Sequence, residues 1–371
     1  MMTPTHGGDV EAVARAFGVV VHELLDFSAS INPLGPPQRV IERLRRDLAD
    51  TSLLARYPDP NYPELREALE ARLKVPQACL AIGNGSAGLL RAVVQSIAPR
   101  TCLLPTPAFS EQGAALAVNG CGVERFPLSS STGFQTDADS LCAAVAATRP
   151  DLLLVTNPHN PSGTLIPRVD MLRLAERTAA AGCQLVIDEA FIDFVPGASV
   201  TSEACCSEHL IVLRSLTKFY GMPALRVGYT VSAPARAALI AAHLPTWPVT
   251  TLAANAAAEA VQDEGYARET IRRAAADRQC LRDRLSNLGI ETFESAGNFL
   301  LLRLPDLGPD STSLRAALIA GHHIIVRDCR SFEGMENGRF VRVAVRTAEE
   351  NIQLVDAIGS LLHSAFAVRG A

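Results

Sequence analysis

The chain has 371 residues, of which 48% are hydrophobic and 20% are charged, and its formal net charge is −5 at pH 7. This composition predicts a globular protein with a large core, and the charge argues against nucleic acid or an anionic membrane as a general partner. No apolar run is long enough to span a membrane, and "MMTPTHGGDVEAV" is not typical of a signal peptide. The nine scattered cysteines lack C-x-x-C spacing, so we expect reduced thiols and a cytoplasmic location.

In chain order, the loop "DFSASINPLGPP" (26–37) precedes a helical pattern, "QRVIERLRRDLAD" (38–50). Short apolar runs then alternate with helical patterns, which predicts βαβ units and a mostly parallel sheet. The expected strands are 78–83, 101–105, 122–127, 151–156, 183–188, 210–215 and 226–232.

The sequence pattern changes after "HLPTWP", where an alanine-rich helical stretch (252–287) precedes further short strands. We therefore expect an α/β fold in three parts. Residues 1–50 would pack with the small domain, 51–247 would form the large cofactor-binding domain, and 248–371 would form a smaller α+β domain.

Polar residues follow several of the expected strands, where open α/β sheets bind their ligands. "NGSAG" (84–88) opens a helix, so Gly85 and Ser86 can present backbone N–H groups to a phosphate. "NPHNPSG" (157–163) contains two Asn-Pro pairs that favour a tight turn projecting Asn160 as a hydrogen-bond donor. The first motif alone is at least as consistent with a plain strand-to-helix turn. The alternative for the second is also a turn and nothing more, although its density of turn residues is unusual for one.

Two further strand ends carry charge. The run "QLVIDEAF" ends a strand in Asp188, a costly place for a carboxylate unless a positive group faces it. "SLTK" brings Ser215, Thr217 and Lys218 together, and Arg226 follows. A lysine in an apolar setting near another cation has a lowered pKa, and its neutral amine can form a Schiff base. Taken alone, Asp188 has a solvated strand end as its alternative interpretation, and Lys218 has a surface lysine in a loop.

Together these groups fit pyridoxal phosphate. Asp188 would keep the pyridine nitrogen protonated, Asn160 would bond the phenolic oxygen, and Lys218 would carry the covalent link. The phosphate would be held by the "NGSAG" backbone with Ser215, Thr217 and Arg226. We expect no metal, because His322 and His323 have no accompanying ligand cluster.

The sequence resembles the fold-type I pyridoxal-phosphate enzymes of the aminotransferase class I/II group over essentially its whole length. The motifs that carry the resemblance are "THGG" (5–8), "DFSASINPLGPP", "RYPDPNYPELREAL" (56–69), "TNPHNPSG", "DEAFIDF" (188–194), "RSLTKFYGMPALRVGY" (214–229) and "VRDCRSFEGM…RFVRVAVR". Within the group, the first two motifs and "DEAFIDF" resemble the threonine-phosphate decarboxylases of cobalamin biosynthesis, which are relatives of the histidinol-phosphate aminotransferases.

The resemblance implies further roles. Phe109 would stack on the cofactor ring, and Tyr57 would reach the cofactor phosphate of the neighbouring subunit in a homodimer. Arg342 would anchor the substrate carboxylate. The remaining substrate contacts would come from His6, Asn32 and Arg327. The structural alternatives are a core phenylalanine, surface arginines and a mobile N-terminal histidine.

The predicted activity is therefore decarboxylation of O-phospho-L-threonine to (R)-1-amino-2-propanol O-2-phosphate and carbon dioxide. A histidinol-phosphate aminotransferase or related transaminase is the alternative, and Phe191 weighs against it because those enzymes usually have tyrosine there. Phosphoserine decarboxylation also stays open. A non-catalytic regulator is disfavoured, because the segment before Asp26 is short and not basic.

Overall fold

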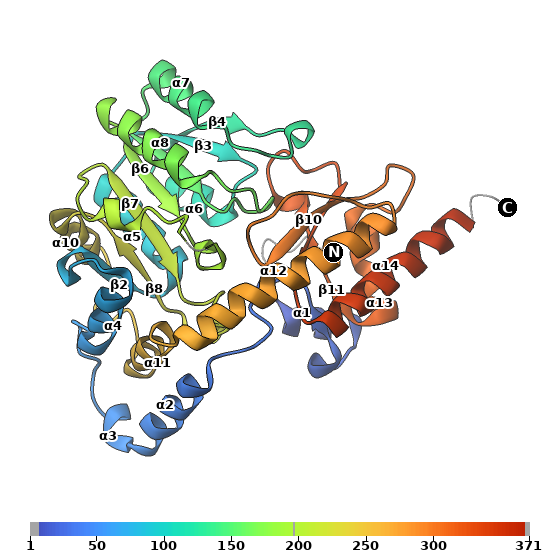
Figure 1. Ribbon diagram of the computed structural model, residues 1–371, viewed down its shortest axis with the longest axis horizontal. Helices are drawn as coiled ribbons and strands as arrows, with labels where there is room; N and C mark the ends of the chain where they lie inside the picture. Colours follow the sequence, from blue (N-terminus) through green and yellow to red (C-terminus); the bar gives the residue numbers. More distant parts are fainter. Residues whose placement is uncertain (1–6, 196, 368–371) are drawn as a thin grey trace.

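The computed structural model describes residues 7–195 and 197–367. Its larger lobe is built on a sheet with strand order β2-β8-β7-β6-β5-β3-β4 (Figure 1). All the strands expected from the sequence are confirmed. Strands β3 to β7 pair in parallel, whereas β8 runs antiparallel to both β7 and β2. The bounds are β2 (Leu80–Gly83), β3 (Thr101–Thr106), β4 (Gly122–Pro127), β5 (Leu152–Thr156), β6 (Gln184–Asp188), β7 (Leu210–Ser215) and β8 (Gly228–Val231).

Helices cover both faces of this sheet, so its central strands are apolar on both sides. Leu153 and Val155 of β5 face one apolar cluster, while Leu152 and Leu154 face the other, as the period of a strand requires. The helices of this lobe are α4 (Pro63–Leu73), α5 (Gly85–Ile97), α6 (Ser110–Val118), α7 (Ala138–Thr148), α8 (Arg168–Ala180), α9 (Thr201–Ala204) and α10 (Pro234–Ala242).

The smaller lobe contains an antiparallel sheet of order β12-β13-β10-β9 and a short parallel pair, β1-β11. Its strands are β1 (Leu25–Asp26), β9 (Glu291–Thr292), β10 (Phe299–Arg303), β11 (Ile324–Ile325), β12 (Arg327–Asp328) and β13 (Phe340–Ala344). Its helices are α1 (Val10–Phe17), α13 (Ser311–His322) and α14 (Ala348–Ala367). Because β1 pairs with β11 and α1 packs beside Ile319 and Ile325, the first part of the chain belongs to this lobe.

The observed packing differs from the expected division of the chain at both boundaries, the one after residue 50 and the one after residue 247. Helices α2 (Gln38–Ala49) and α11 (Thr251–Val261) pack against each other, and the buried alanines of α11 belong to the core of the larger lobe. The alanine-rich stretch is two helices, because Asp263 caps a new helix, α12 (Glu264–Asn287), by accepting from the Tyr266 N–H. Helix α12 then carries the chain into the smaller lobe (Figure 1).

The remaining short elements are α3 (Thr51–Leu54) and the 3₁₀ turns η1 (Val21–Glu23), η2 (Gln77–Cys79), η3 (Ser130–Thr132), η4 (Ile192–Phe194), η5 (Pro223–Leu225) and η6 (Cys329–Ser331). All nine cysteines lie in the described part of the chain, and each is a free thiol. Within residues 7–195 and 197–367, no helix is both long enough and apolar enough to cross a membrane. The same residues contain no group of His, Cys, Asp and Glu side chains arranged to hold a metal ion.

Candidate active site

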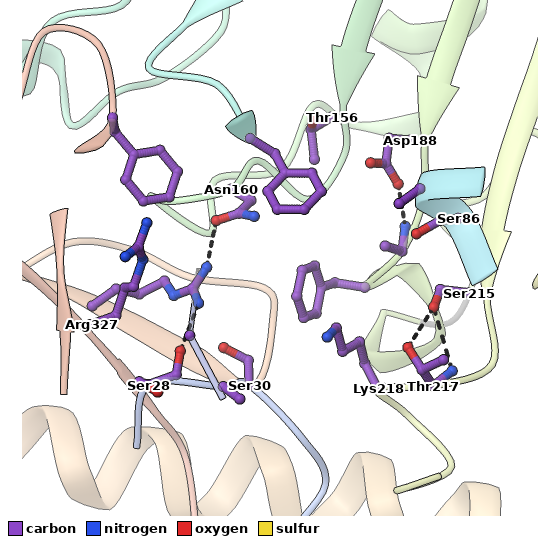
Figure 2. A pocket seen from close by; sticks show the side chains of 18 of the residues that line it. Ser28, Ser30, Ser86, Thr156, Asn160, Asp188, Ser215, Thr217, Lys218 and Arg327 are labelled. Atoms are coloured by element: carbon purple, nitrogen blue, oxygen red, sulfur yellow. Dashed lines mark hydrogen bonds between the residues drawn. The ribbon is translucent and has the colours of Figure 1, made fainter. Parts of the chain in front are cut away.

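A cavity of about 200 Å³ lies where the carboxyl ends of β5, β6 and β7 meet the smaller lobe. Figure 2 shows its two sides: Asp188, Ser86 and Ser215 lie on one, and Asn160, Arg327 and Ser28 lie on the other. The larger lobe provides the first side. The second combines a loop of the larger lobe with residues of the smaller lobe, so neither lobe contains the whole site.

Asp188 and Lys218 share this cavity. Asp188 is the buried last residue of β6, and its Oδ1 accepts a hydrogen bond from the Ala190 N–H at 3.1 Å. Burial raises the pKa of Asp188 to about 6, although that hydrogen bond and the positive charge of Lys218 act in the opposite direction. A cation that binds beside this carboxylate would therefore stabilise its charged form.

Lys218 lies three residues beyond β7, and its amine points into the space between the two sides of the cavity (Figure 2). Burial is the main cause that lowers its pKa to about 8, and the nearby guanidinium groups of Arg342 and Arg226 lower it further. Asp188 and Asp26 oppose this shift. The result is an amine that is neutral far more often than an ordinary lysine, as nucleophilic chemistry requires.

Next to this pair lies a site suited to an anion. Ser86 at the first turn of α5 lines the cavity together with Ser215, Thr217 and Arg226, and the Ser215 and Thr217 hydroxyl oxygens are 2.8 Å apart. Gly85 has φ +70°, and a Cβ there would lie 2.8 Å from Arg226 Nη2. Glycine therefore allows the guanidinium to approach the start of the helix, where backbone N–H groups favour negative charge.

On the opposite side, Arg342 of β13 organises the groups around it. Its Nη1 donates to Asn160 Oδ1 at 2.6 Å, and its Nη2 donates to the Ser28 carbonyl oxygen at 3.0 Å. Because the Asn160 oxygen is occupied, its amide nitrogen is the atom that can donate to a ligand. Burial lowers the pKa of Arg342 to about 10, so the group still carries its charge at neutral pH.

Arg327 of β12 places a second guanidinium in the cavity wall. It is 3% exposed, its Nη2 donates to the Ser331 hydroxyl, and the guanidinium carbon lies 5.3 Å from the centre of the Phe332 ring. Phe109 and Phe191 supply aromatic surface to the same cavity. Phe191 meets Phe299 edge to face at 4.9 Å, so the position after Ala190 is apolar.

Asn32 does not line this cavity. Its amide nitrogen lies 2.8 Å from the Phe219 carbonyl oxygen, 2.8 Å from the Tyr266 hydroxyl and 3.0 Å from the Thr270 hydroxyl. Its Oδ1 accepts from the Leu34 N–H at 3.1 Å. These internal hydrogen bonds hold the loop after β1 against α12, which differs from the expected contact with substrate.

Tyr57 also lies outside the cavity. It is 75% exposed and stacks on Trp247, with ring centres 4.1 Å apart. Its expected contact with a neighbouring subunit stays a prediction, and His6 falls outside the described residues. Among the cavity residues that were not predicted, Thr156 ends β5 and would have been found by the strand-end rule. Ser28, Ser30 and Phe332 lie in motifs that were recognised without a role for these side chains.

Comparison with known proteins agrees with this geometry. The family model described as aminotransferase class I and II matches residues 22–358. The chain belongs to this aminotransferase family. One relative within it is threonine-phosphate decarboxylase of Salmonella typhimurium, which is 35% identical over 370 residues, 98% of both proteins.

Two solved structures of similar fold illustrate the range of the aminotransferase family. Histidinol-phosphate aminotransferase from Sinorhizobium meliloti, solved with pyridoxal-5'-phosphate, has a TM-score of 0.85, 24% identity and 98% coverage of each chain. L-threonine-O-3-phosphate decarboxylase from Porphyromonas gingivalis has a TM-score of 0.81 and 23% identity, and the match covers 91% of this chain and 99% of that one. One fold thus serves two different reactions on phosphorylated substrates.

Proposed function

We propose that this chain decarboxylates O-phospho-L-threonine to (R)-1-amino-2-propanol O-2-phosphate and carbon dioxide in cobalamin biosynthesis, with pyridoxal phosphate as its cofactor. The observation that carries the proposal is full-length similarity to the Salmonella typhimurium decarboxylase, combined with a cavity that holds Lys218, Asp188 and two buried arginines. Phe191 supports decarboxylation over transamination, since it brings no hydroxyl to the cavity.

The residues present fit the cofactor. Its phosphate would lie at the start of α5, held by Ser86, Ser215, Thr217 and Arg226. Its ring nitrogen would face Asp188, whose raised pKa falls when a cation comes close. Asn160 would donate to the phenolic oxygen, and Phe109 would cover the ring. When bound, the cofactor supplies an electron sink for the bond that breaks at Cα.

The substrate would be held by charge. Arg342 and Arg327 are two guanidinium groups on the side of the smaller lobe, which suits a substrate that carries both a carboxylate and a phosphate. By holding both charged groups of the substrate, they would fix its orientation, and that orientation would select loss of carbon dioxide over loss of a proton. The Nζ of Lys218, with a pKa of about 8, can then deliver a proton to Cα.

The activity is tested with the purified protein, pyridoxal phosphate and O-phospho-L-threonine. We expect stoichiometric release of carbon dioxide without any keto acid, and no release from the Lys218→Ala variant. O-phospho-L-serine in a parallel reaction shows whether the methyl group is needed. Amino transfer to 2-oxoglutarate from histidinol phosphate, with no carbon dioxide from phosphothreonine, would establish the transaminase instead.

We also infer a cytoplasmic homodimer in which Tyr57 reaches the cofactor phosphate of the other subunit. The stacked, exposed pair of Tyr57 and Trp247 supports a contact surface here, and nine free thiols support a reducing compartment. Analytical ultracentrifugation measures the mass of the assembly and so tests whether it is a dimer. Mixing Tyr57→Ala with Lys218→Ala subunits should restore activity in hybrid dimers, because one site then has both residues. No restoration would mean that Tyr57 does not act across an interface.

A further inference from the structure

A buried histidine joins two loops that form the cavity. Phe109 lies in the loop between β3 and α6, and Asn160 lies in the loop after β5. His159, which directly precedes Asn160, is 4% exposed and does not line the cavity. Its Nε2 lies 2.8 Å from the carbonyl oxygen of Pro107, two residues before Phe109. One hydrogen bond therefore spans 52 positions of sequence between the two loops.

The partners of the imidazole fix its protonation state. A carbonyl oxygen only accepts, so Nε2 carries the hydrogen and donates it to Pro107. Nδ1 is then the acceptor, and the Ser162 hydroxyl donates to it at 2.7 Å. Burial lowers the pKa of His159 to about 4, which keeps the ring neutral at physiological pH.

The surroundings make this contact between loops a rigid one. Thr164 donates its hydroxyl hydrogen to the Phe134 carbonyl oxygen at 3.1 Å, and its oxygen lies 2.9 Å from Ser162 Oγ. A second bond joins the same two regions, because Gln112 Nε2 of α6 donates to the Thr156 hydroxyl at 2.7 Å. Ser162, the local partner of His159, therefore contacts a residue that is itself bonded, and α6 is tied to the end of β5 close to both loops.

We propose that His159 is a positioning residue: through the Pro107 carbonyl it sets the spacing between Phe109 and Asn160, and with it the orientation of the bound cofactor ring. This inference rests on the proposed function, since the ring is that of pyridoxal phosphate. His159 acts without touching the ring, by fixing one loop against the other. A loss of the Nε2 donor would leave a buried carbonyl unpaired and let the Phe109 loop move.

Two substitutions of His159 distinguish the role of its Nε2 from that of its Nδ1. In His159→Gln the side-chain amide extends to the position of Nε2 and keeps a donor for Pro107. In His159→Asn the shorter amide reaches only the position of Nδ1, so it keeps the Ser162 contact and loses the bond between the loops. Ser162→Ala is the matched control, because it removes the local partner and leaves the Pro107 bond in place.

The readouts are the dissociation constant of pyridoxal phosphate for the apoprotein and the visible circular dichroism of the saturated protein, which reports ring orientation. For His159→Asn we expect about three- to tenfold weaker binding, the effect of one lost hydrogen bond, and a smaller dichroic band per bound cofactor. His159→Gln and Ser162→Ala should both match the wild type. A general loss of packing would lower thermal stability without this difference between the amides.

Equal values for His159→Asn and His159→Gln, whether both normal or both impaired, would overturn the inference. The imidazole nitrogen shifts of the wild-type protein provide a test that needs no variant, since a hydrogen on Nδ1 instead of Nε2 would contradict the bond to Pro107. Failure of the wild type to bind pyridoxal phosphate would instead overturn the proposed function. The two ideas therefore fail on different measurements.

Discussion

The depressed pKa of Lys218 predicts how the apoprotein captures its cofactor as pH changes. Only the neutral amine attacks an aldehyde, so the capture rate follows the neutral fraction of Lys218. Burial and two nearby arginines lower its pKa from 10.5 to about 8. At pH 7 roughly a tenth of Lys218 is then neutral, against about one molecule in 3,000 for an ordinary lysine. The structure thus predicts a gain of roughly 300-fold in reactive amine at neutral pH.

The chain provides its own control, because Lys74 and Lys218 are its two lysines and Lys74 is exposed at the end of α4. Apoprotein is mixed rapidly with pyridoxal phosphate at several pH values and the absorbance change is followed. Borohydride then traps the linked amine, and peptide mass spectrometry assigns it to one lysine. We expect the rate to rise tenfold per pH unit and to level off above about pH 8.

A plateau that begins only near pH 10 would refute this account of Lys218, as would trapping mainly at Lys74. The direction of the effect follows from the sign of the shift. Burial penalises the charged amine, so the folded protein releases this proton more readily than the unfolded chain does. In the folded state, Lys218 is therefore reactive over a range where the unfolded chain is mostly protonated.

Two substitutions test other parts of the site, and a third tests a buried ion pair outside the cavity, in which Arg214 of β7 lies 3.4 Å from Glu189 Oε2 and 2.5 Å from Asp193 Oδ1. Asp188→Asn should weaken cofactor binding about 10- to 100-fold in a fluorescence titration at pH 8, and the wild type should approach the variant below pH 6 as Asp188 takes up a proton. Arg342→Lys should raise KM for phosphothreonine by more than tenfold in steady-state assays. A lysine ammonium group lacks the planar, forked set of N–H donors with which a guanidinium can bind Asn160 and a carboxylate together. Arg214→Met should lower the free energy of unfolding in urea by about 3–5 kcal/mol, because it leaves the carboxylates of Glu189 and Asp193 without their buried partner. An effect under 1 kcal/mol would mean that this ion pair behaves like an exposed one.

The sequence predicted those parts of the fold that depend on local pattern. Apolar runs such as Leu210–Ser215 are long enough, and bounded clearly enough by turn residues, to be recognised as strands. The chemistry at the strand ends followed, because parallel strands that point the same way bring their ends to one edge. Asp188 and Lys218 were placed together by that geometry.

Prediction from the sequence is weakest where distant contacts decide the packing. The alanines of α11 are equally compatible with either lobe, and only packing against α2 and α4 assigns them to the larger one. Asn32 bonds with Tyr266 and Thr270, more than 230 positions away. No local sequence pattern shows that the Asn32 amide donates hydrogen bonds to these hydroxyl groups. His159 shows the same limit, because its partner Pro107 lies on another strand–helix connection.

The hydrogen bond between Arg342 and Asn160 crosses from one lobe to the other. A substrate carboxylate that binds Arg342 has to share or displace that contact. Arg327 and Arg342 both belong to the smaller lobe, so both charged ends of the proposed substrate would attach to that lobe, and its amine would point to Lys218 of the larger lobe. The contact that binds the substrate would thus also release Asn160 from Arg342, and an amino acid without a carboxylate at that position would leave the bond between the lobes intact.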